Sequence, residues 1–230
     1  MLKYKCIVLD HDDTVVDSTA SVHYPAFIEA LKVLRPGQEN SITLEEYFKE
    51  NFHGGFIPMC EELYDFTAAD FDVEVEIWKS YVMEHVPEAF AGIKELLWKY
   101  KEAGGIITVV SHSFDFNIIR DYEANGLPKP DMIFGWECEA WQRKPSIYGP
   151  EQIAKKYNLK PTDMVMIDDL KPGFDMAKAF GMDFIGAGWC KSAPEIYEFM
   201  QRECQTYLRK VEELEKHLFY EIRTNRIIRQ

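Results

Sequence analysis

The sequence has few cysteines and few basic residues. Its 230 residues include five scattered cysteines with no CxxC pair, which argues against a disulfide framework and a cysteine-based zinc site. Lysine and arginine number 26 against 39 acidic residues, so the formal net charge is -13. Because nucleic-acid phosphates require basic surfaces, nucleic acid is not an expected partner. An anionic ligand must be held locally, by a cation or by aimed hydrogen-bond donors.

Long hydrophobic runs are also missing. No stretch of about 18 uncharged apolar residues occurs, so the sequence predicts no membrane-spanning helix and no membrane partner. The N-terminal residues MLKYKC lead directly into a strand-like pattern and do not resemble a signal peptide, so we expect a cytoplasmic protein. An apolar content of 47% is ample for a packed core.

Short apolar runs alternate with helical patterns over most of the chain. The runs predict strands at residues 4–10, 106–111, 131–134, 164–167 and 183–188. The spacing of apolar residues predicts helices at 92–103, 115–125, 150–157 and 172–180. Such alternation is typical of an α/β fold, a doubly wound, Rossmann-like parallel sheet with helices on both faces.

Two segments depart from this alternation. Residues 18–86 contain four helical patterns, around 22–34, 43–51, 57–66 and 71–85, and no convincing strand. We therefore expect a core domain of residues 1–17 and 87–193, interrupted by an all-helical cap domain at 18–86.

In the tail, residues 194–230, apolar residues recur at intervals of three and four as far as about residue 222, which predicts one long amphipathic C-terminal helix. Its apolar stripe is expected to pack on the core or to pair with a second copy, giving a monomer or a homodimer.

Carboxylates and a hydroxyl follow the predicted strands. Asp10 and Asp12 follow the first strand in CIVLDHDDT, Ser111 ends IITVVS, and Asp168 and Asp169 end MVMIDD. Because the carboxyl ends of parallel strands meet at one edge, these groups should converge there. Carboxylates gathered in this way repel one another unless a cation joins them, and oxygen ligands favour Mg²⁺. A strand-end aspartate often merely caps the next helix, but that does not explain the whole set.

The order and spacing of these motifs resemble those of the haloacid dehalogenase superfamily of phosphohydrolases. The resemblance covers about residues 4–192 and is closest to members with a helical cap after the first strand, such as phosphoglycolate phosphatases and β-phosphoglucomutases. It implies that Asp10 is the nucleophile, that Asp12 is the general acid and base, and that Thr14 positions the substrate. Where the family usually has glycine or another small residue, this chain has Asp13, a residue type that tolerates unusual backbone angles.

The resemblance also implies roles for the later motifs. Ser111 and the backbone amide of His112 would bind phosphate oxygens, and Lys144 in QRKPSIYGP would neutralise the phosphate. Arg143 is the competitor for that last role, although the proline after Lys144 favours the lysine. The magnesium ligands implied by the family are Asp10 and Asp169 through their carboxylates, Asp12 through its carbonyl, and Asp168 directly or through water.

The cap loop NFHGGF, residues 51–56, is the segment that we expect to contact substrate. His53 offers a polar group, and Gly54 permits close approach. The equally weighted alternative is a plain turn between two helices.

The expected function is Mg²⁺-dependent hydrolysis of a small phosphorylated metabolite through an aspartyl-phosphate on Asp10. A phosphomutase of the β-phosphoglucomutase type and a non-catalytic binding or assembly module on the same fold are the alternatives.

Overall fold

A six-stranded parallel sheet forms the centre of the molecule. The computed structural model describes residues 1–190 and 192–220, and its strands lie in the order β3-β2-β1-β4-β5-β6. Their bounds are β1 Cys6–Leu9, β2 Ile106–Val110, β3 Met132–Phe134, β4 Met164–Asp168, β5 Asp183–Ala187 and β6 Tyr207–Leu208. In the central pairs, Leu9 lies opposite both Val109 and Ile167. The residues that follow these three positions therefore reach the same edge of the sheet.

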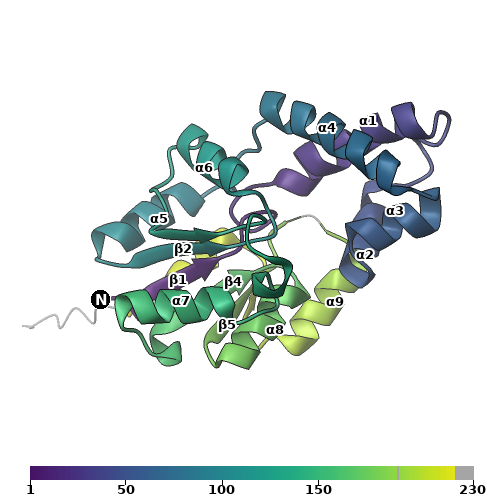
Figure 1. The fold of residues 1–230 in the computed structure, drawn as a ribbon. Coiled ribbons are helices and arrows are strands. Elements are labelled where there is room, and N and C mark those ends of the chain that lie inside the picture. Colours follow the sequence, from purple (N-terminus) through teal and green to yellow (C-terminus); the bar gives the residue numbers. More distant parts are fainter. Residues whose placement is uncertain (191, 221–230) are drawn as a thin grey trace, which may run out of the picture.

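Helices cover both faces of this sheet (Figure 1). On one face lie α5 (Ile93–Glu102), α6 (Asp115–Ala124) and α10 (Glu215–Leu218), and on the other lie α7 (Tyr148–Tyr157) and α8 (Lys171–Phe180). Strand side chains alternate between the two, so that Ile7 packs toward the first group of helices and Val8 toward the second. The predicted doubly wound α/β fold is confirmed.

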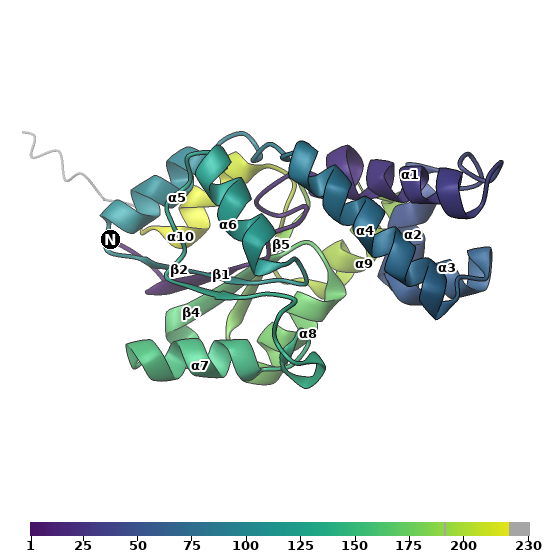
Figure 2. The ribbon, with the colours of Figure 1, turned by 45° about the horizontal axis from the view of Figure 1, so that its top comes forward.

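The inserted segment is all-helical and has its own apolar core. It consists of a π-helical turn, η1 (Thr19–His23), and the helices α1 (Tyr24–Leu34), α2 (Leu44–His53), α3 (Phe56–Tyr64) and α4 (Ala68–Glu84). Phe27 and Tyr47 are among the buried residues that join these helices. Figures 1 and 2 show the cap beyond the carboxyl ends of the strands, next to α9 (Pro194–Glu203). Among the described residues, no helix combines the length and apolar character that crossing a membrane requires.

The prediction of one long C-terminal helix is wrong. The helix α9 ends at Glu203, and the chain then forms β6, a 3₁₀ turn at Val211–Glu213 and the short α10. The physical reason lies at the end of β5, where side chains at Gly186, within the strand, and Gly188, just after it, would collide with the ring of Tyr207. Their lack of a side chain admits that ring and lets β6 pair with the sheet edge. Residues 221–230 of the predicted tail lie outside the described residues.

The apolar side chains of the tail are buried within the chain. The apolar side chains of α9 pack with the cap residues Phe48 and Phe52. Those of the 3₁₀ turn and α10 pack together with α5 on one face of the sheet. The buried tail residues are Ile196, Met200, Cys204, Leu208, Val211, Leu214 and Leu218. They are therefore unavailable as a stripe for pairing with a second copy.

Candidate active site

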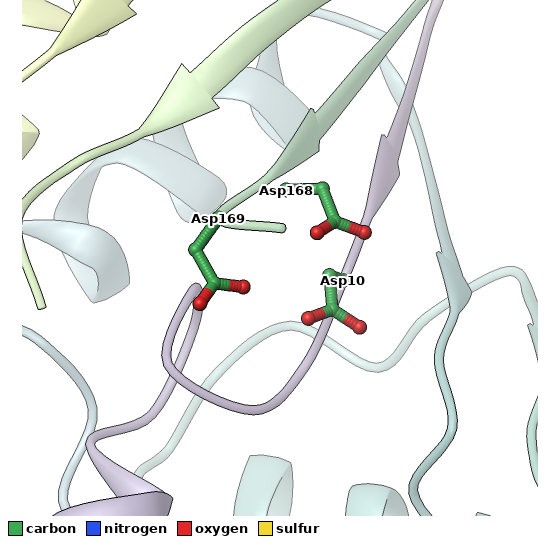
Figure 3. A group of neighbouring side chains, drawn as sticks. All are labelled: Asp10, Asp168 and Asp169. Atoms are coloured by element: carbon green, nitrogen blue, oxygen red, sulfur yellow. The ribbon is translucent and has the colours of Figure 1, made fainter. Parts of the chain in front are cut away.

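Three carboxylates converge at the carboxyl edge of the sheet. Asp10 directly follows β1, Asp168 is the last residue of β4, and Asp169 comes next in the chain. Their side chains are buried, and one oxygen of each lies within 4.8 Å of the others. Figure 3 shows the three carboxylates gathered around a common space. This closeness follows from the register, which aligns the ends of β1 and β4.

Lys144 reaches this cluster from the loop after β3. Its Nζ donates to Asp10 Oδ1 at 2.7 Å and to Asp168 Oδ2 at 2.7 Å. Burial acts to lower the pKa of Lys144, but the two carboxylates outweigh it and hold that pKa above its ordinary value. Arg143 points elsewhere, because its Nε donates to the carbonyl of Cys138 and its guanidinium lies over the ring of Trp136. Of the two basic residues, the structure brings Lys144 to the carboxylates.

The remaining oxygens of the cluster fit a hard divalent cation. Both oxygens of Asp168 are engaged, Oδ2 by Lys144 and Oδ1 by the backbone amide of Leu170 at 2.8 Å. Burial raises the pKa of Asp168 to about 7 and that of Asp169 well above its ordinary value, and the neighbouring carboxylates add to both effects. A cation would relieve this repulsion. Asp10 and Asp169 are the side chains best placed to hold it, while Asp168 orients Lys144.

Asp12 faces away from the cluster and toward the cap. Its Oδ1 accepts hydrogen bonds from Ser18 Oγ at 2.7 Å and from His23 Nε2 at 3.1 Å. Burial acts to raise the pKa of Asp12, but His23 and the hydrogen bond from Ser18 outweigh it and hold the pKa below its ordinary value. The two motif aspartates therefore occupy different environments, Asp10 beside a buried lysine and Asp12 beside the first turn of the cap.

Asp13 has a structural role that accounts for its departure from the family pattern. Its backbone is left-handed, with φ of 57°, a conformation that aspartate adopts more readily than most residues. Its Oδ1 accepts from the backbone amide of Thr19 at 3.1 Å, where the π-helical turn begins. Burial raises the pKa of Asp13 to about 7, and its charge acts to raise the pKa of Asp169. Asp13 thus links the turn after β1 to the start of the cap.

Ser111, His112 and Thr14 also lie at this edge. Ser111 Oγ accepts from the amide of Ser113 at 3.2 Å, which leaves its proton available for a phosphate oxygen. His112 Nε2 donates to the carbonyl of Lys144 at 3.0 Å and so connects the loops after β2 and β3. Thr14 Oγ1 lies 3.4 Å from Asp169 Oδ1, a contact that orients a carboxylate.

Comparison with known proteins shows which family this chain belongs to. A family model described as haloacid dehalogenase-like hydrolase matches residues 4–181. The chain belongs to this family. The expected enzyme class, a phosphatase of the haloacid dehalogenase-like type, is confirmed.

Individual relatives are distant in sequence but similar over most of their length. A phosphoglycolate phosphatase of Mesorhizobium japonicum is 21% identical over 205 residues, spanning 84% of this chain and 86% of that protein. The structure of a predicted phosphoglycolate phosphatase from Haemophilus somnus is similar with a TM-score of 0.73 and 17% identity, over 94% of this chain and 99% of that chain. CbbY from Rhodobacter sphaeroides, in complex with phosphate, has a TM-score of 0.68 and 21% identity, over 92% and 96%. The structural likenesses establish the shared fold.

In this haloacid dehalogenase-like hydrolase, the loop 51–56 lies against the tail. His53 Nε2 lies 2.7 Å from Glu195 Oε1 of α9, and more than half of the His53 side chain is exposed. Gly55, with φ of 90°, forms the turn between α2 and α3. Among the described residues, no hydrogen bond or ion pair joins His53 or Gly54 to Asp10, Asp168 or Asp169, so the structure does not bring these two predicted residues to the acidic cluster.

Two residues that contact the site were not predicted from the sequence. Ser18 and Trp78 were not singled out, although Ser18 contacts Asp12 and Trp78 contacts His23. The available signal was weak. His23 occupies the start of the first cap helix, and Trp78 lies one helical turn after Glu74, a buried acidic residue on the same helix.

Proposed function

We propose that this hydrolase is a Mg²⁺-dependent phosphatase that acts on a small phosphorylated metabolite through an aspartyl-phosphate on Asp10. The observation that carries the proposal is the separation of the two motif carboxylates. Asp10 is bound by Lys144 at the acidic cluster, while Asp12 is bound by Ser18 and His23 on the side of the cap. Carboxyl groups in different environments can take different roles, one as nucleophile and one as acid and base.

The proposed reaction has two displacements. In the first, an oxygen of Asp10 forms a bond to phosphorus, the bond to the leaving oxygen breaks, and that oxygen takes a proton from Asp12. Asp12 must therefore bind this proton when substrate enters, against the low pKa that His23 and Ser18 impose on it in the absence of substrate. In the second, water attacks the phosphorus, Asp12 takes a proton from the water, and the bond from phosphorus to Asp10 breaks. Inorganic phosphate leaves and both aspartates return to their initial states.

Three other groups hold the phosphoryl oxygens or the cation in this scheme. Lys144 and the hydroxyl of Ser111 supply positive charge and a hydrogen bond to the transferring group. Asp10 and Asp169, with the main-chain carbonyl of Asp12, would hold Mg²⁺, which supplies charge stabilisation when bound. The names of the relatives, which include phosphoglycolate phosphatase and a phosphate-bound protein, support a small phosphorylated substrate.

The charges of the cap favour hydrolysis over a phosphomutase reaction. A mutase must hold a second phosphate while the first is transferred, which requires a cation near the site. All four basic residues of the cap pair with cap carboxylates: Lys32, Arg35, Lys49 and Lys79. None of these pairs involves a catalytic carboxylate. We also propose a cytoplasmic location, since all five cysteines are free thiols.

Phosphate release from a panel of phosphomonoesters, with Mg²⁺ and with EDTA, tests the proposal. Asp10→Asn should reduce kcat by roughly 10⁴-fold or more, because it removes the nucleophile. Asp175→Asn, which alters an exposed pair on α8, is the matched control and should retain activity. Persistent hydrolysis by pure Asp10→Asn protein would contradict the mechanism. Inactivity of the wild-type protein on every ester would support the binding-module alternative.

A further inference from the structure

The cap contacts Asp12 through two donors on one oxygen. Ser18 Oγ and His23 Nε2 both lie within hydrogen-bonding distance of Asp12 Oδ1, and both come from the segment that leads into the cap. An oxygen that accepts two hydrogen bonds has little capacity left to carry a proton. The proton that Asp12 exchanges in the proposed reaction must therefore reside on Oδ2.

Trp78 determines which nitrogen of His23 carries a proton. The indole Nε1 of Trp78 lies 3.1 Å from His23 Nδ1, and the two rings stack with centroids 6.1 Å apart. An indole N–H can only donate, so Nδ1 must be the acceptor. The ring proton is then on Nε2, which is the nitrogen that faces Asp12. In this chain of hydrogen bonds each residue donates to the next, Trp78 to His23 and His23 to Asp12.

This chain joins three separate parts of the molecule. Trp78 belongs to α4, His23 ends the π-helical turn, and Asp12 lies on the turn after β1. The ring of Trp78 also lies 5.4 Å from the ring of Phe114, which precedes α6 of the core. The contacts therefore depend on the cap being seated on the core as it is in this structure. Burial acts to lower the pKa of His23, but the carboxylates of Asp12, Asp13 and Asp121 outweigh it. A doubly protonated ring could not accept the N–H of Trp78 at Nδ1, so this hydrogen bond favours the neutral ring while the cap is seated.

We infer that Trp78 and His23 are positioning residues, which align Asp12 for proton transfer only when the cap is seated on the core. The inference rests on the proposed phosphatase function and extends it. Trp78 fixes the tautomer of His23, and His23 with Ser18 holds Oδ1, so that Oδ2 is presented to the leaving oxygen. Cap seating thus becomes a condition for acid and base assistance, in addition to excluding water.

The dependence of the first-turnover rate on the leaving group distinguishes a positioning role from a purely structural one, because a purely structural defect would slow the reaction of all esters alike. Release of an alkoxide, as from ribose 5-phosphate, needs a proton from Asp12, whereas p-nitrophenolate leaves readily without one. In the full-length protein with Mg²⁺, His23→Ala should slow first-turnover release of ribose by roughly 10²-fold. First-turnover release of p-nitrophenol should keep its rate. The later hydrolysis of the aspartyl-phosphate should slow, so that p-nitrophenol release acquires a burst.

Two conservative variants sharpen this test. Trp78→Phe keeps a ring and removes only the N–H, so it should reproduce the alkyl-selective loss in a milder form. Trp98→Phe is the matched control, because Trp98 donates its indole N–H to the carbonyl of Gly126 on the core. His23→Gln should restore part of the lost rate, since an amide can accept from Trp78 and donate to Asp12.

An NMR measurement on the wild-type protein needs no turnover and keeps the inference testable if a variant folds poorly. The ¹⁵N chemical shifts of the histidine rings in the wild-type protein should show the Nε2–H tautomer for His23, assigned by its loss in His23→Gln. A proton on Nδ1 would overturn the inference, as would equal losses on both esters or identical behaviour of Trp78→Phe and Trp98→Phe. If no ester is hydrolysed by the wild-type protein, the proposed function fails, and the tautomer measurement still decides the hydrogen-bond chain.

Discussion

Two segments lie between the core and the cap, and they differ in how firmly their side chains are held. In the turn over residues 10–14, Asp10, Asp13 and Thr14 are buried, and each contacts a side chain or backbone amide from another part of the chain. In the loop over residues 51–56, His53 is largely exposed and has an exposed partner. The first segment is fixed by the strand that precedes it. The second depends on how the cap meets the tail.

This difference separates the chemistry of the site from its selectivity. Groups that must stabilise charge in a transition state are most effective when they are held in advance, as Lys144 is between two carboxylates. A cap segment that moves with its domain can admit and release substrate. Changes to the residues that hold the fixed turn should therefore have larger effects on activity and stability than changes to the cap loop.

The largest effect is expected from Lys144→Met. The change leaves Asp10 and Asp168 buried without their cation, which should reduce stability by about 3–5 kcal/mol. The loss of charge stabilisation should lower kcat by roughly 10²–10³-fold. Urea unfolding and phosphate release measure the two effects. Lys171→Met, which breaks an exposed pair on α8, is the control and should change neither appreciably. Comparable losses in both variants would show that the buried ion pairs of Lys144 contribute no more to stability and activity than the exposed pair of Lys171.

A pair of glycine substitutions compares the acidic cluster, which Gly173 of α8 contacts, with the cap loop. A Cβ on Gly173 would overlap the carboxylate of Asp168, so Gly173→Ala should cost about 1–3 kcal/mol. Displacement of that carboxylate and of Lys144 should reduce kcat by roughly 10²-fold.

In the cap loop, a Cβ on Gly54 would meet Pro58 at an ordinary 3.5 Å, and Gly54→Ala should fold normally. Thermal unfolding and steady-state kinetics of both variants provide the comparison. A raised KM for Gly54→Ala alone would show that the loop approaches substrate closely, as the sequence analysis expected.

The same distinction explains how much could be predicted from the sequence. Asp10 and Ser111 follow apolar strands directly and Asp168 is the last residue of one. Because parallel strands bring such ends to one edge of the sheet, the convergence of these residues follows from a local pattern. The hydrogen bond between Trp78 and His23 joins residues 55 positions apart and depends on how α4 packs beside α1. No periodicity in the sequence encodes that docking.

In the tail, the spacing of apolar residues did not predict the secondary structure correctly. Its apolar residues recur at helical intervals, but the buried ones are distributed over four short elements, which are α9, β6, the 3₁₀ turn and α10. The signal for the interruption lay elsewhere in the chain, in Gly186 and Gly188 at the end of β5, which admit the ring of Tyr207. Helical spacing over residues 194–222 was therefore compatible with more than one structure, and contacts distant in sequence decided between them.

Metal binding should reverse a pH-dependent loss of stability at the acidic edge. Folding raises the pKa of Asp168 and of Asp13 from 3.8 to about 7, so the folded protein binds more protons than the unfolded chain in this range. With EDTA present, the free energy of unfolding should therefore fall as pH rises from about 4 to about 7.

At pH 7.5, Mg²⁺ at 100 times its Kd should restore about 2.7 kcal/mol. For a chain of this size, that corresponds to a rise in Tm of roughly 5–10 °C. Thermal unfolding over this pH range, with and without Mg²⁺, measures both effects. A Tm that Mg²⁺ leaves unchanged in wild type, or raises equally in Asp169→Asn, would contradict a metal site here.

The smallest effect is expected at His53. Its pair with Glu195 is exposed on both sides, so His53→Ala should change stability by less than about 1 kcal/mol. Glu195→Gln removes the same pair from the other side and is the matched control. If the pair only attaches the cap to α9, the two variants should have equal kinetics on every phosphomonoester. If KM rises for His53→Ala and not for Glu195→Gln, the imidazole reaches substrate in a cap position other than the one seen here, and the loop takes part in selecting the substrate.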